Sequence, residues 1–245
     1  MTNRTQTIFG IDEKAVICLS GGLDSTVMLS MLIAQGFKTI YPLFFSYGSK
    51  HNTHEMNSFR RIIGYYGMDQ NVRIFNMYNV FVKMESDLLN HGGDIPEGHY
   101  CEPSMSRTVV PGRNAIFISV AAGFAQSVGA TKVYIAAHSG DHHIYPDCRP
   151  DFLEKMKDVV ELMTERKVKL AFPFRDNDKA DIVKIGHGYG APFELTRTCY
   201  KNQPIACGRC GSCTERLEAF HKNSLTDPLD YENQPGDWIA TDNEL

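Results

Sequence analysis

The sequence lacks any long hydrophobic run. Its apolar stretches never approach the roughly 18 consecutive residues that a membrane-spanning helix needs. The first residues, MTNRTQTIFGIDEK, contain no apolar segment long enough for an export signal. We therefore expect a cytoplasmic protein with no membrane partner, in a compartment where disulfide bonds are rare.

An excess of positive charge is also missing. The chain has 25 Lys and Arg residues against 29 Asp and Glu residues, which gives a formal net charge of −4. Such a chain has no overall attraction to nucleic acid or to anionic lipid. A nucleic-acid partner is therefore disfavoured, although this count does not exclude a local basic face.

Internal repeats and low-complexity tracts are absent too, and what the 245 residues show instead is an alternation of two kinds of segment. Short β-rich runs alternate with longer segments of helical spacing, which predicts an α/β fold with an open, mostly parallel sheet. The predicted strands begin at Lys14, Lys38, Asn71, Thr131 and Lys167. The predicted helices span 25–35, 53–66, 114–127, 151–163 and 179–187.

The alternation is interrupted in two places. Residues 87–111 are rich in Gly, Pro and His and predict a long functional loop. After Leu195 the pattern stops and a cysteine cluster follows. We therefore expect an α/β domain over residues 1–195 and a small metal-binding region over residues 196–245.

The stretch AVICLSGGLDSTVM, from Ala15 to Met28, predicts a phosphate site. It reads as a buried strand, a turn through Ser20, Gly21 and Gly22, and a helix that ends near Gly36. Backbone N–H groups at a helix N-terminus are unpaired and favour an anion, and glycines let the backbone approach it. The alternative is a plain strand-to-helix turn in which Asp24 or Ser25 caps the helix.

The stretch TCYKNQPIACGRCGSC predicts a metal site. Cys199, Cys207, Cys210 and Cys213 are separated by seven, two and two residues. Four thiolates at this spacing can surround Zn²⁺ in a closed tetrahedron, whose role would be structural. An iron–sulfur cluster and a set of unliganded thiols are the alternatives.

The SGGLDS loop resembles the PP-loop of the ATP pyrophosphatase superfamily, which implies a Rossmann-like fold and the use of ATP with Mg²⁺. In that superfamily pyrophosphate leaves while AMP passes to the substrate, which suits the absence of a phosphate-gripping lysine from this loop. Two more stretches, VVPGRNAIFISVAAGFA from Val109 and GDHHIYPDCRPDF from Gly140, narrow the resemblance. Together with the cysteine cluster they are similar to the 7-cyano-7-deazaguanine synthase family, over about residues 14–220.

That resemblance implies a carbon–nitrogen ligase that converts 7-carboxy-7-deazaguanine, ATP and ammonia to the nitrile, through an adenylated acid and an amide. It also implies a homodimer. The residues implied in ATP binding are Leu19, Ser20, Gly21, Gly22, Leu23, Asp24, Ser25, Thr26, Val27, Met28, Leu29 and Lys179. Those implied in substrate binding are Arg113, Asn114, Asp141, Asp147 and Arg149. Those implied in catalysis are Ser20, Asp24, Ser25, Arg113, Asp141 and Arg149.

Several of these residues also have purely structural interpretations. Arg113 and Asn114 could mark an ordinary helix start, and Lys179 could be a solvated lysine at the start of another helix. Asp141, Asp147 and Arg149 could form a charged turn held by an internal ion pair. Cys148, which has no base placed beside it by sequence, is expected to be a packed thiol.

The chain also departs from the family at two motifs. It has HHIYPDCRP where many members have YSGYPDCRP, and TRTCY around Arg197 where they have TWSCY. A relative that stops at the 7-amido compound, or that acts on another acid, therefore stays open. So do a tRNA-thiolating PP-loop enzyme and a non-catalytic nucleotide-binding module.

Overall fold

The five strands in the described part of the chain form one parallel sheet. The computed structural model describes residues 13–99 and 102–233. Within them the strand order is β3-β2-β1-β4-β5, and every neighbouring pair is parallel. The strands are β1 (Lys14–Cys18), β2 (Thr39–Ser46), β3 (Arg73–Asn76), β4 (Lys132–Tyr134) and β5 (Lys169–Ala171). This order places β1 at the centre and confirms the predicted parallel α/β sheet.

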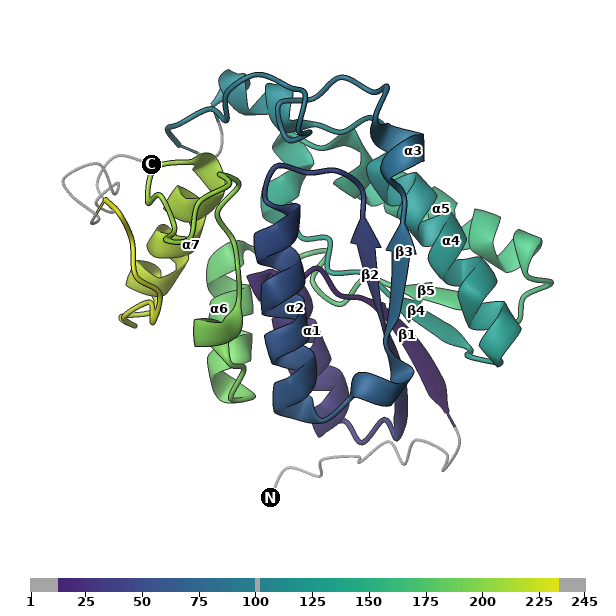
Figure 1. Ribbon diagram of the computed structural model, residues 1–245. Coiled ribbons are helices and arrows are strands. Elements are labelled where there is room, and N and C mark those ends of the chain that lie inside the picture. The colour runs from purple at the N-terminus through teal and green to yellow at the C-terminus, as the bar shows by residue number, and fades with distance from the viewer. Residues whose placement is uncertain (1–12, 100–101, 234–245) are drawn as a thin grey trace.

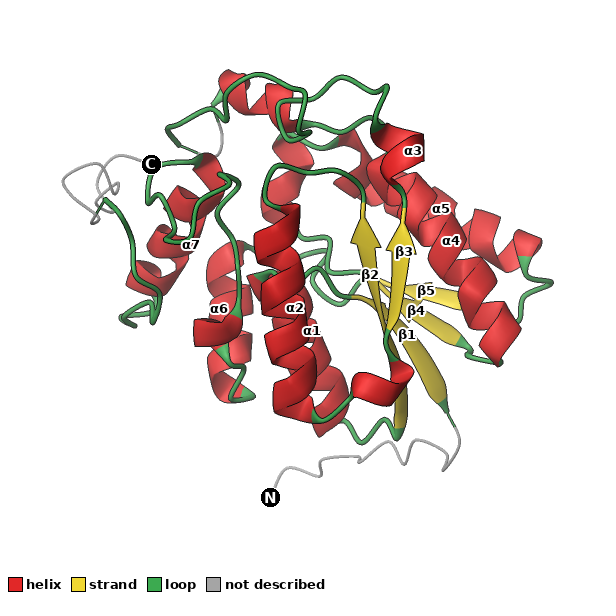
Figure 2. Ribbon diagram, in the orientation of Figure 1, coloured by secondary structure: helices red, strands yellow, loops and turns green. Residues whose placement is uncertain are grey.

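Helices cover both faces of this sheet (Figures 1 and 2). They are α1 (Leu23–Ala34), α2 (Asn52–Tyr66), α3 (Tyr78–Phe81), α4 (Arg113–Val128), α5 (Pro150–Met163), α6 (Lys179–Gly188) and α7 (Gly211–Lys222). Short 3-10 helices lie at Asp69–Asn71, Pro103–Thr108, Ser139–His143, Pro146–Cys148 and Phe193–Leu195. Among the described residues, no helix has the length and apolar character to cross a membrane.

Alternate residues of β1 point into two different cores, as the twofold repeat of a strand requires. Ala15 and Ile17 are buried with side chains of α1, α2 and α6. Val16 is buried with side chains of α4 and α5 on the other face. Because β1 is buried on both faces, its near-continuous apolar sequence is accounted for.

The five predicted strands and five predicted helices are all present, and the helices shift by at most two residues at their ends. The predicted fourth strand, which ran from Thr131 to Ser139, is much shorter, because β4 ends at Tyr134 and leaves His138 in the loop that follows. Helix α1 begins at Leu23 rather than at Ser25. Helix α7 was not predicted, because its first turn lies inside the cysteine cluster. It packs on the core of the α/β sheet, where Phe220 meets Phe193 at a ring-centroid distance of 5.1 Å.

The long loop after α3 and the cysteine region share a third core. Leu88, Leu89 and Ile95 of the loop are buried together with the four clustered cysteines. The backbone N–H of Gly98 also donates to the Arg209 carbonyl at 3.1 Å. The loop therefore links the upper edge of the sheet to the cysteine region, as Figure 1 shows.

Candidate functional site

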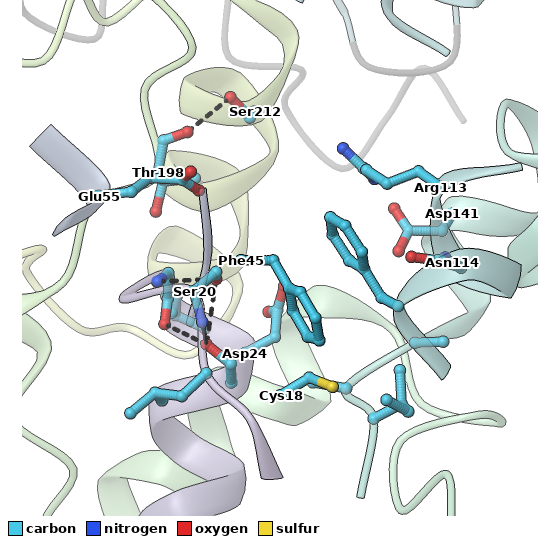
Figure 3. A pocket seen from close by; sticks show the side chains of 18 of the residues that line it. Cys18, Ser20, Asp24, Phe45, Glu55, Arg113, Asn114, Asp141, Thr198 and Ser212 are labelled. Carbon is cyan, nitrogen blue, oxygen red and sulfur yellow. Dashed lines mark hydrogen bonds between the residues drawn. The ribbon is translucent and has the colours of Figure 1, made fainter. Parts of the chain in front are cut away.

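The described residues enclose a pocket of about 240 Å³ at the carboxyl ends of β1 and β4. The chain adds β2 and β3 on one side of β1, and it then adds β4 and β5 on the other side. The switch point is therefore between β1 and β4. Open α/β sheets bind their ligands at such a switch point, because the loops that follow the two strands diverge there. Ser20 follows β1 and His138 follows β4, and both line the pocket. Figure 3 shows this pocket from close by.

The loop between β1 and α1 is held by its own hydroxyl groups. Ser20 Oγ accepts from the N–H of Gly22 at 3.1 Å and lies 3.2 Å from Ser25 Oγ. Thr26 Oγ1 donates to the Gly22 carbonyl at 2.7 Å. The first N–H groups of α1 have no partners within the helix and lie at its positive end, next to the pocket. The loop therefore has the geometry of an anion site.

The two glycines of the loop meet different requirements. Gly21 has φ of +81°, and a Cβ there would lie 2.7 Å from the Glu55 carbonyl oxygen of α2. Its carbonyl accepts from the N–H of Arg197 at 2.8 Å, so Gly21 fixes the loop between α2 and the segment after Leu195. Gly22 has an ordinary φ of −76° and lines the pocket. A Cβ there would lie 3.1 Å from Ser20 Oγ and 3.5 Å from the Arg197 carbonyl oxygen.

Some residues of the stretch from Leu19 to Leu29 line the pocket, and others are buried in the core. The residues that line the pocket are Leu19, Ser20, Gly22, Leu23, Asp24 and Ser25. The residues that are fully buried in the core beneath are Thr26, Val27, Met28 and Leu29. The pocket therefore meets only the loop and the first turn of α1.

Asp24 and Lys179 form a close ion pair in the pocket. Lys179 Nζ lies 2.8 and 2.7 Å from the two Asp24 carboxylate oxygens and 3.3 Å from Glu215 Oε2 of α7. Burial raises the pKa of Asp24, but the charges of Lys179, His138 and Arg216 and the hydrogen bond from Lys179 together outweigh burial, and the pKa is lowered. Burial alone would lower the pKa of Lys179. The nearby carboxylates, Asp24 first, have the larger combined effect and raise the pKa of Lys179. Asp24 and Lys179 are therefore both charged in the folded protein.

His138, which sequence analysis did not single out, completes this charged group. Its side chain is 1% exposed, and Nδ1 accepts from the N–H of Gly140 at 3.1 Å. Nε2 therefore carries the ring proton of the neutral form. It lies 3.7 Å from Asp24 Oδ2 and 3.5 Å from Asp141 Oδ2. His138 thus connects the carboxylate on α1 with the one that follows β4.

Arg113 lies at the other end of the pocket in an aromatic enclosure. Its guanidinium carbon is 5.7 Å from the ring centroids of both Tyr47 and Tyr145, and Nη1 donates to the Tyr47 hydroxyl at 3.2 Å. Tyr200 lines the same region, with its hydroxyl 3.5 Å from that of Tyr145. A flat cation flanked by aromatic rings is suited to binding a planar heterocycle or its carboxylate. Figure 3 shows Arg113 and Asn114 across the pocket from Ser20, with Phe45 between them.

The remaining predicted substrate residues are placed differently. Asn114 lines the pocket, but its backbone N–H donates to Asp147 Oδ2 at 2.9 Å and its side chain donates to Cys148 Sγ at 3.1 Å. Asp147 is buried behind it and caps the start of α4 rather than lining the pocket. Arg149 is exposed, and its Nε donates to the His142 carbonyl at 3.0 Å. Of these residues, only Asn114 reaches the pocket directly.

The four clustered cysteines come together as a compact buried group. All four sulfur atoms lie within 4.8 Å of one another, and Cys207 Sγ is 3.9 Å from Cys213 Sγ. A tetrahedron of Zn–S bonds about 2.3 Å long has sulfur–sulfur edges of about 3.8 Å. An iron–sulfur cluster lies between its thiolates and holds them farther apart. The spacing therefore fits a single metal ion.

The backbone around the cluster supports thiolates. The N–H groups of Arg209 and Cys210 point to Cys207 Sγ at 3.4 and 3.2 Å. Hydrogen bonds from the other cysteines, Cys199 first, and from the Arg209 N–H lower the pKa of the Cys207 thiol. Hydrogen bonding within the cluster, with Cys199 first, raises the pKa of the Cys210 and Cys213 thiols, so a bound metal ion would have to displace their protons. The cluster can therefore hold a metal.

A buried arginine joins the cysteine region to the pocket. Arg216 of α7 forms a two-pronged ion pair with Asp227, at 2.7 and 2.9 Å, and Nη1 donates to Thr198 Oγ1 at 3.0 Å. Thr198 lines the pocket. Tyr231 donates to the same Asp227 at 2.6 Å, so residues 223–233 fold back over the cluster rather than lying loosely on the surface.

The comparisons with known proteins agree on one family. The family model described as "Queuosine biosynthesis protein QueC" matches residues 14–224. A 7-cyano-7-deazaguanine synthase of Pseudoalteromonas atlantica is 44% identical over 220 residues, which is 90% of this chain and 99% of that one. Its counterpart in Methanoregula boonei is 42% identical over 219 residues, 89% of this chain and 99% of that one.

Two solved structures resemble the chain at a lower level. One is a 4-thiouridine synthetase–RNA complex with bound ATP, with a TM-score of 0.46 and 17% identity over 78% of this chain and 44% of the other. The second is the U34-tRNA thiolase NcsA from Methanococcus maripaludis with its [4Fe-4S] cluster, with a TM-score of 0.46 and 14% identity over 94% of this chain and 78% of the other. The family match spans most of the chain, and the relatives are covered almost end to end. The chain belongs to the QueC family, whose relatives named here are 7-cyano-7-deazaguanine synthases.

Proposed function

We propose that the protein is an ATP-dependent carbon–nitrogen ligase that converts 7-carboxy-7-deazaguanine and ammonia to 7-cyano-7-deazaguanine. The observation that carries this proposal is one pocket with two chemically different ends. One end is the Ser20 loop, with the features of a phosphate site, and the other is Arg113 between Tyr47 and Tyr145. A ligase that joins AMP to a planar heterocyclic acid needs both ends in a single pocket.

The phosphate end acts through backbone and hydroxyl groups. Ser20, Gly22 and Ser25 bind the phosphates at the start of α1, where the helix dipole favours negative charge. Lys179 adds a positive charge and holds Asp24 in place. The carboxylates of Asp24 and Asp141 are the oxygen ligands that would hold the Mg²⁺ accompanying ATP, and that ion would neutralise phosphate charge.

The aromatic end binds the substrate acid. The planar deazaguanine lies against Tyr47 or Tyr145, and Arg113 offers hydrogen bonds to the carboxylate and to the charge that develops on it. Asn114 and Asp147 keep the start of α4, and so Arg113, in place. We propose that Arg149 acts from outside the pocket by holding the His142 carbonyl, and with it the turn that carries Asp141.

One site then performs two activations. ATP adenylates the carboxylate and pyrophosphate leaves, and ammonia displaces AMP to give the primary amide. A second ATP adenylates the amide oxygen, and loss of AMP leaves the nitrile. The same loop delivers AMP to an oxygen atom each time, so no second nucleotide site is needed.

We also propose that the four cysteines hold one structural zinc ion. The donor set is four thiols, the sulfur spacing suits Zn–S bonds, and a four-cysteine site leaves no open position for chemistry. The metal would fix Thr198 and α7 against the pocket through the Arg216 network. We further propose a cytoplasmic homodimer, whose mass light scattering would measure.

Pyrophosphate release tests this function against its alternatives. We expect ATP-dependent release only when the deazaguanine acid is added, and none with unmodified tRNA in its place. Release that depends on tRNA would instead indicate a thiolating enzyme. An absence of release with either compound would leave a nucleotide-binding module. The control is the same mixture without ATP, which measures the background pyrophosphate signal.

A further inference from the structure

One titratable side chain of the pocket has a buried ring nitrogen with no partner. His51 lies between β2 and α2, lines the pocket and is 2% exposed. Within the described part of the chain, its Nδ1 is buried and makes no hydrogen bond. A buried polar atom without a partner is costly, so such an atom in a ligand pocket points to a ligand group as its partner.

The other nitrogen of His51 is oriented by a carboxylate. Nε2 lies 3.4 Å from Glu55 Oε2, one helical turn along α2. The imidazole lies against the ring of Tyr200, with centroids 5.3 Å apart. A carboxylate beside Nε2 favours the tautomer that keeps its proton there, and the lone pair is then on Nδ1. This is the arrangement of a general base held in position by an acidic neighbour.

The other ionisable groups of the pocket are less suited to accept a proton at neutral pH. Both nitrogens of His138 face partners, Gly140 on one side and the two carboxylates on the other. Asp24 and Glu215 lie against Lys179. Burial, with Asp141 adding to it, raises the pKa of the Cys148 thiol well above its usual value. Of these described side chains, His51 is the one whose ring presents a buried nitrogen without a partner.

His51 lies between the two ends of the pocket, because its ring contacts Tyr200 of the aromatic end and its partner Glu55 belongs to the helix beside the Ser20 loop. The backbone of α2 at Glu55 passes so close to the loop that a Cβ at Gly21 would be 2.7 Å from the Glu55 carbonyl oxygen. Figure 3 shows Glu55 on the same side as Ser20 and Thr198, across from Arg113. In the proposed function, the bonds to AMP form and break between these two ends.

We propose that His51, oriented by Glu55, accepts a proton from nitrogen in both steps, first from the attacking ammonia and then from the adenylated amide; this rests on the proposed function. In the first step the ammonia nitrogen bonds to the carboxyl carbon, the C–O bond to AMP breaks, and AMP leaves with the electron pair. The proton lost from nitrogen goes to Nδ1. The imidazolium then returns this proton to solvent. In the second step adenylation of the amide oxygen releases pyrophosphate, and one of the two nitrogen protons is lost to solvent. The remaining N–H proton goes to Nδ1 as the C–O bond to AMP breaks, AMP leaves with the electron pair and the triple bond forms.

The test compares two nitrogen nucleophiles in a His51→Gln variant. Glutamine can still donate to Glu55 but cannot act as a base. Acid-dependent exchange of pyrophosphate with ATP should stay within about threefold of wild type, because adenylation needs no proton from nitrogen. Amide formation from ammonium should fall by about 10²- to 10⁴-fold, the usual contribution of a general base.

The reaction with hydroxylamine distinguishes a role of His51 as a base from a purely structural role. It is unprotonated at neutral pH and a strong nucleophile, whereas ammonia is present mostly as ammonium. Hydroxamate formation by the variant should therefore stay close to that of wild type. Glu55→Gln, which keeps the imidazole but removes its orienting charge, should lower only the ammonium-dependent rate. His54→Gln is the matched control, because His54 lies on α2 next to Glu55 but outside the pocket, and it should change neither reaction.

Three outcomes would overturn the assignment. Normal amide formation by His51→Gln would show that the imidazole accepts no proton. Parallel loss of pyrophosphate exchange and of both nitrogen reactions would show a structural role. A wild-type protein that exchanges no pyrophosphate with this acid would overturn the proposed function itself, and the base assignment with it.

Discussion

Replacing Gly22 by valine is expected to abolish ATP turnover while leaving the fold intact. Gly22 has a φ that any residue adopts, so valine does not strain the backbone. Its first carbon, however, would lie 3.1 Å from Ser20 Oγ, and the branched methyl groups would extend into the space where phosphates approach the loop. Even a shift of about 1 Å in a bound reactant can cost about 10²-fold in rate.

Acid-dependent pyrophosphate release is the measurement for this variant. Gly64→Val is the matched control, because Gly64 lies on α2 with nothing within 4 Å of an added Cβ. It should keep wild-type activity. Thermal unfolding of both variants shows whether the fold persists. A Gly22→Val protein that is folded and releases pyrophosphate at the normal rate would remove the phosphate-site assignment.

Replacing Cys210 by serine is expected to release the metal and destabilise the whole protein. A structural zinc of this kind contributes on the order of 10 kcal/mol to folding, which is comparable with the total stability of a typical domain. Cys210 also precedes α7, which carries Arg216 and Glu215. Losing the ligand therefore loosens the C-terminal region and the side of the pocket it supports.

Metal analysis together with thermal unfolding checks this prediction. Wild type should contain one zinc per chain, and Cys210→Ser none, with a much lower melting temperature. Cys18→Ala, which changes a cysteine outside the cluster, should keep the zinc. Iron in place of zinc, or a metal-free wild-type protein of full stability, would contradict the account.

Local sequence predicted the strand, loop and helix around Ser20 because their geometry is local. A strand, two glycines and a helix start place Ser20 and Asp24 at a sheet edge with little help from the rest of the fold. The extent of the site along α1 was less predictable. Thr26 to Leu29 continue the motif in sequence, but the helix turns them into the core, where they are fully buried.

Residues brought together by packing between distant segments were harder to predict. Glu215 reaches Lys179 only because α7 packs on α6, and the cysteine pattern did not show that α7 existed. His138 had an available signal, since it lies in the loop that follows β4 at the switch point. The local sequence did not distinguish Arg113, which lines the pocket, from Arg149, which does not. Arg113 is the first residue of α4 and Arg149 directly precedes α5, so both occur at a helix start.

The most direct test of the central claim counts AMP against product. Purified protein with ATP, ammonium and 7-carboxy-7-deazaguanine is analysed by mass spectrometry. The account predicts the nitrile with two AMP per molecule, and it predicts that added 7-amido-7-deazaguanine is converted without ammonia. One AMP per molecule with accumulation of the amide would contradict it, and so would an acid that stays unchanged.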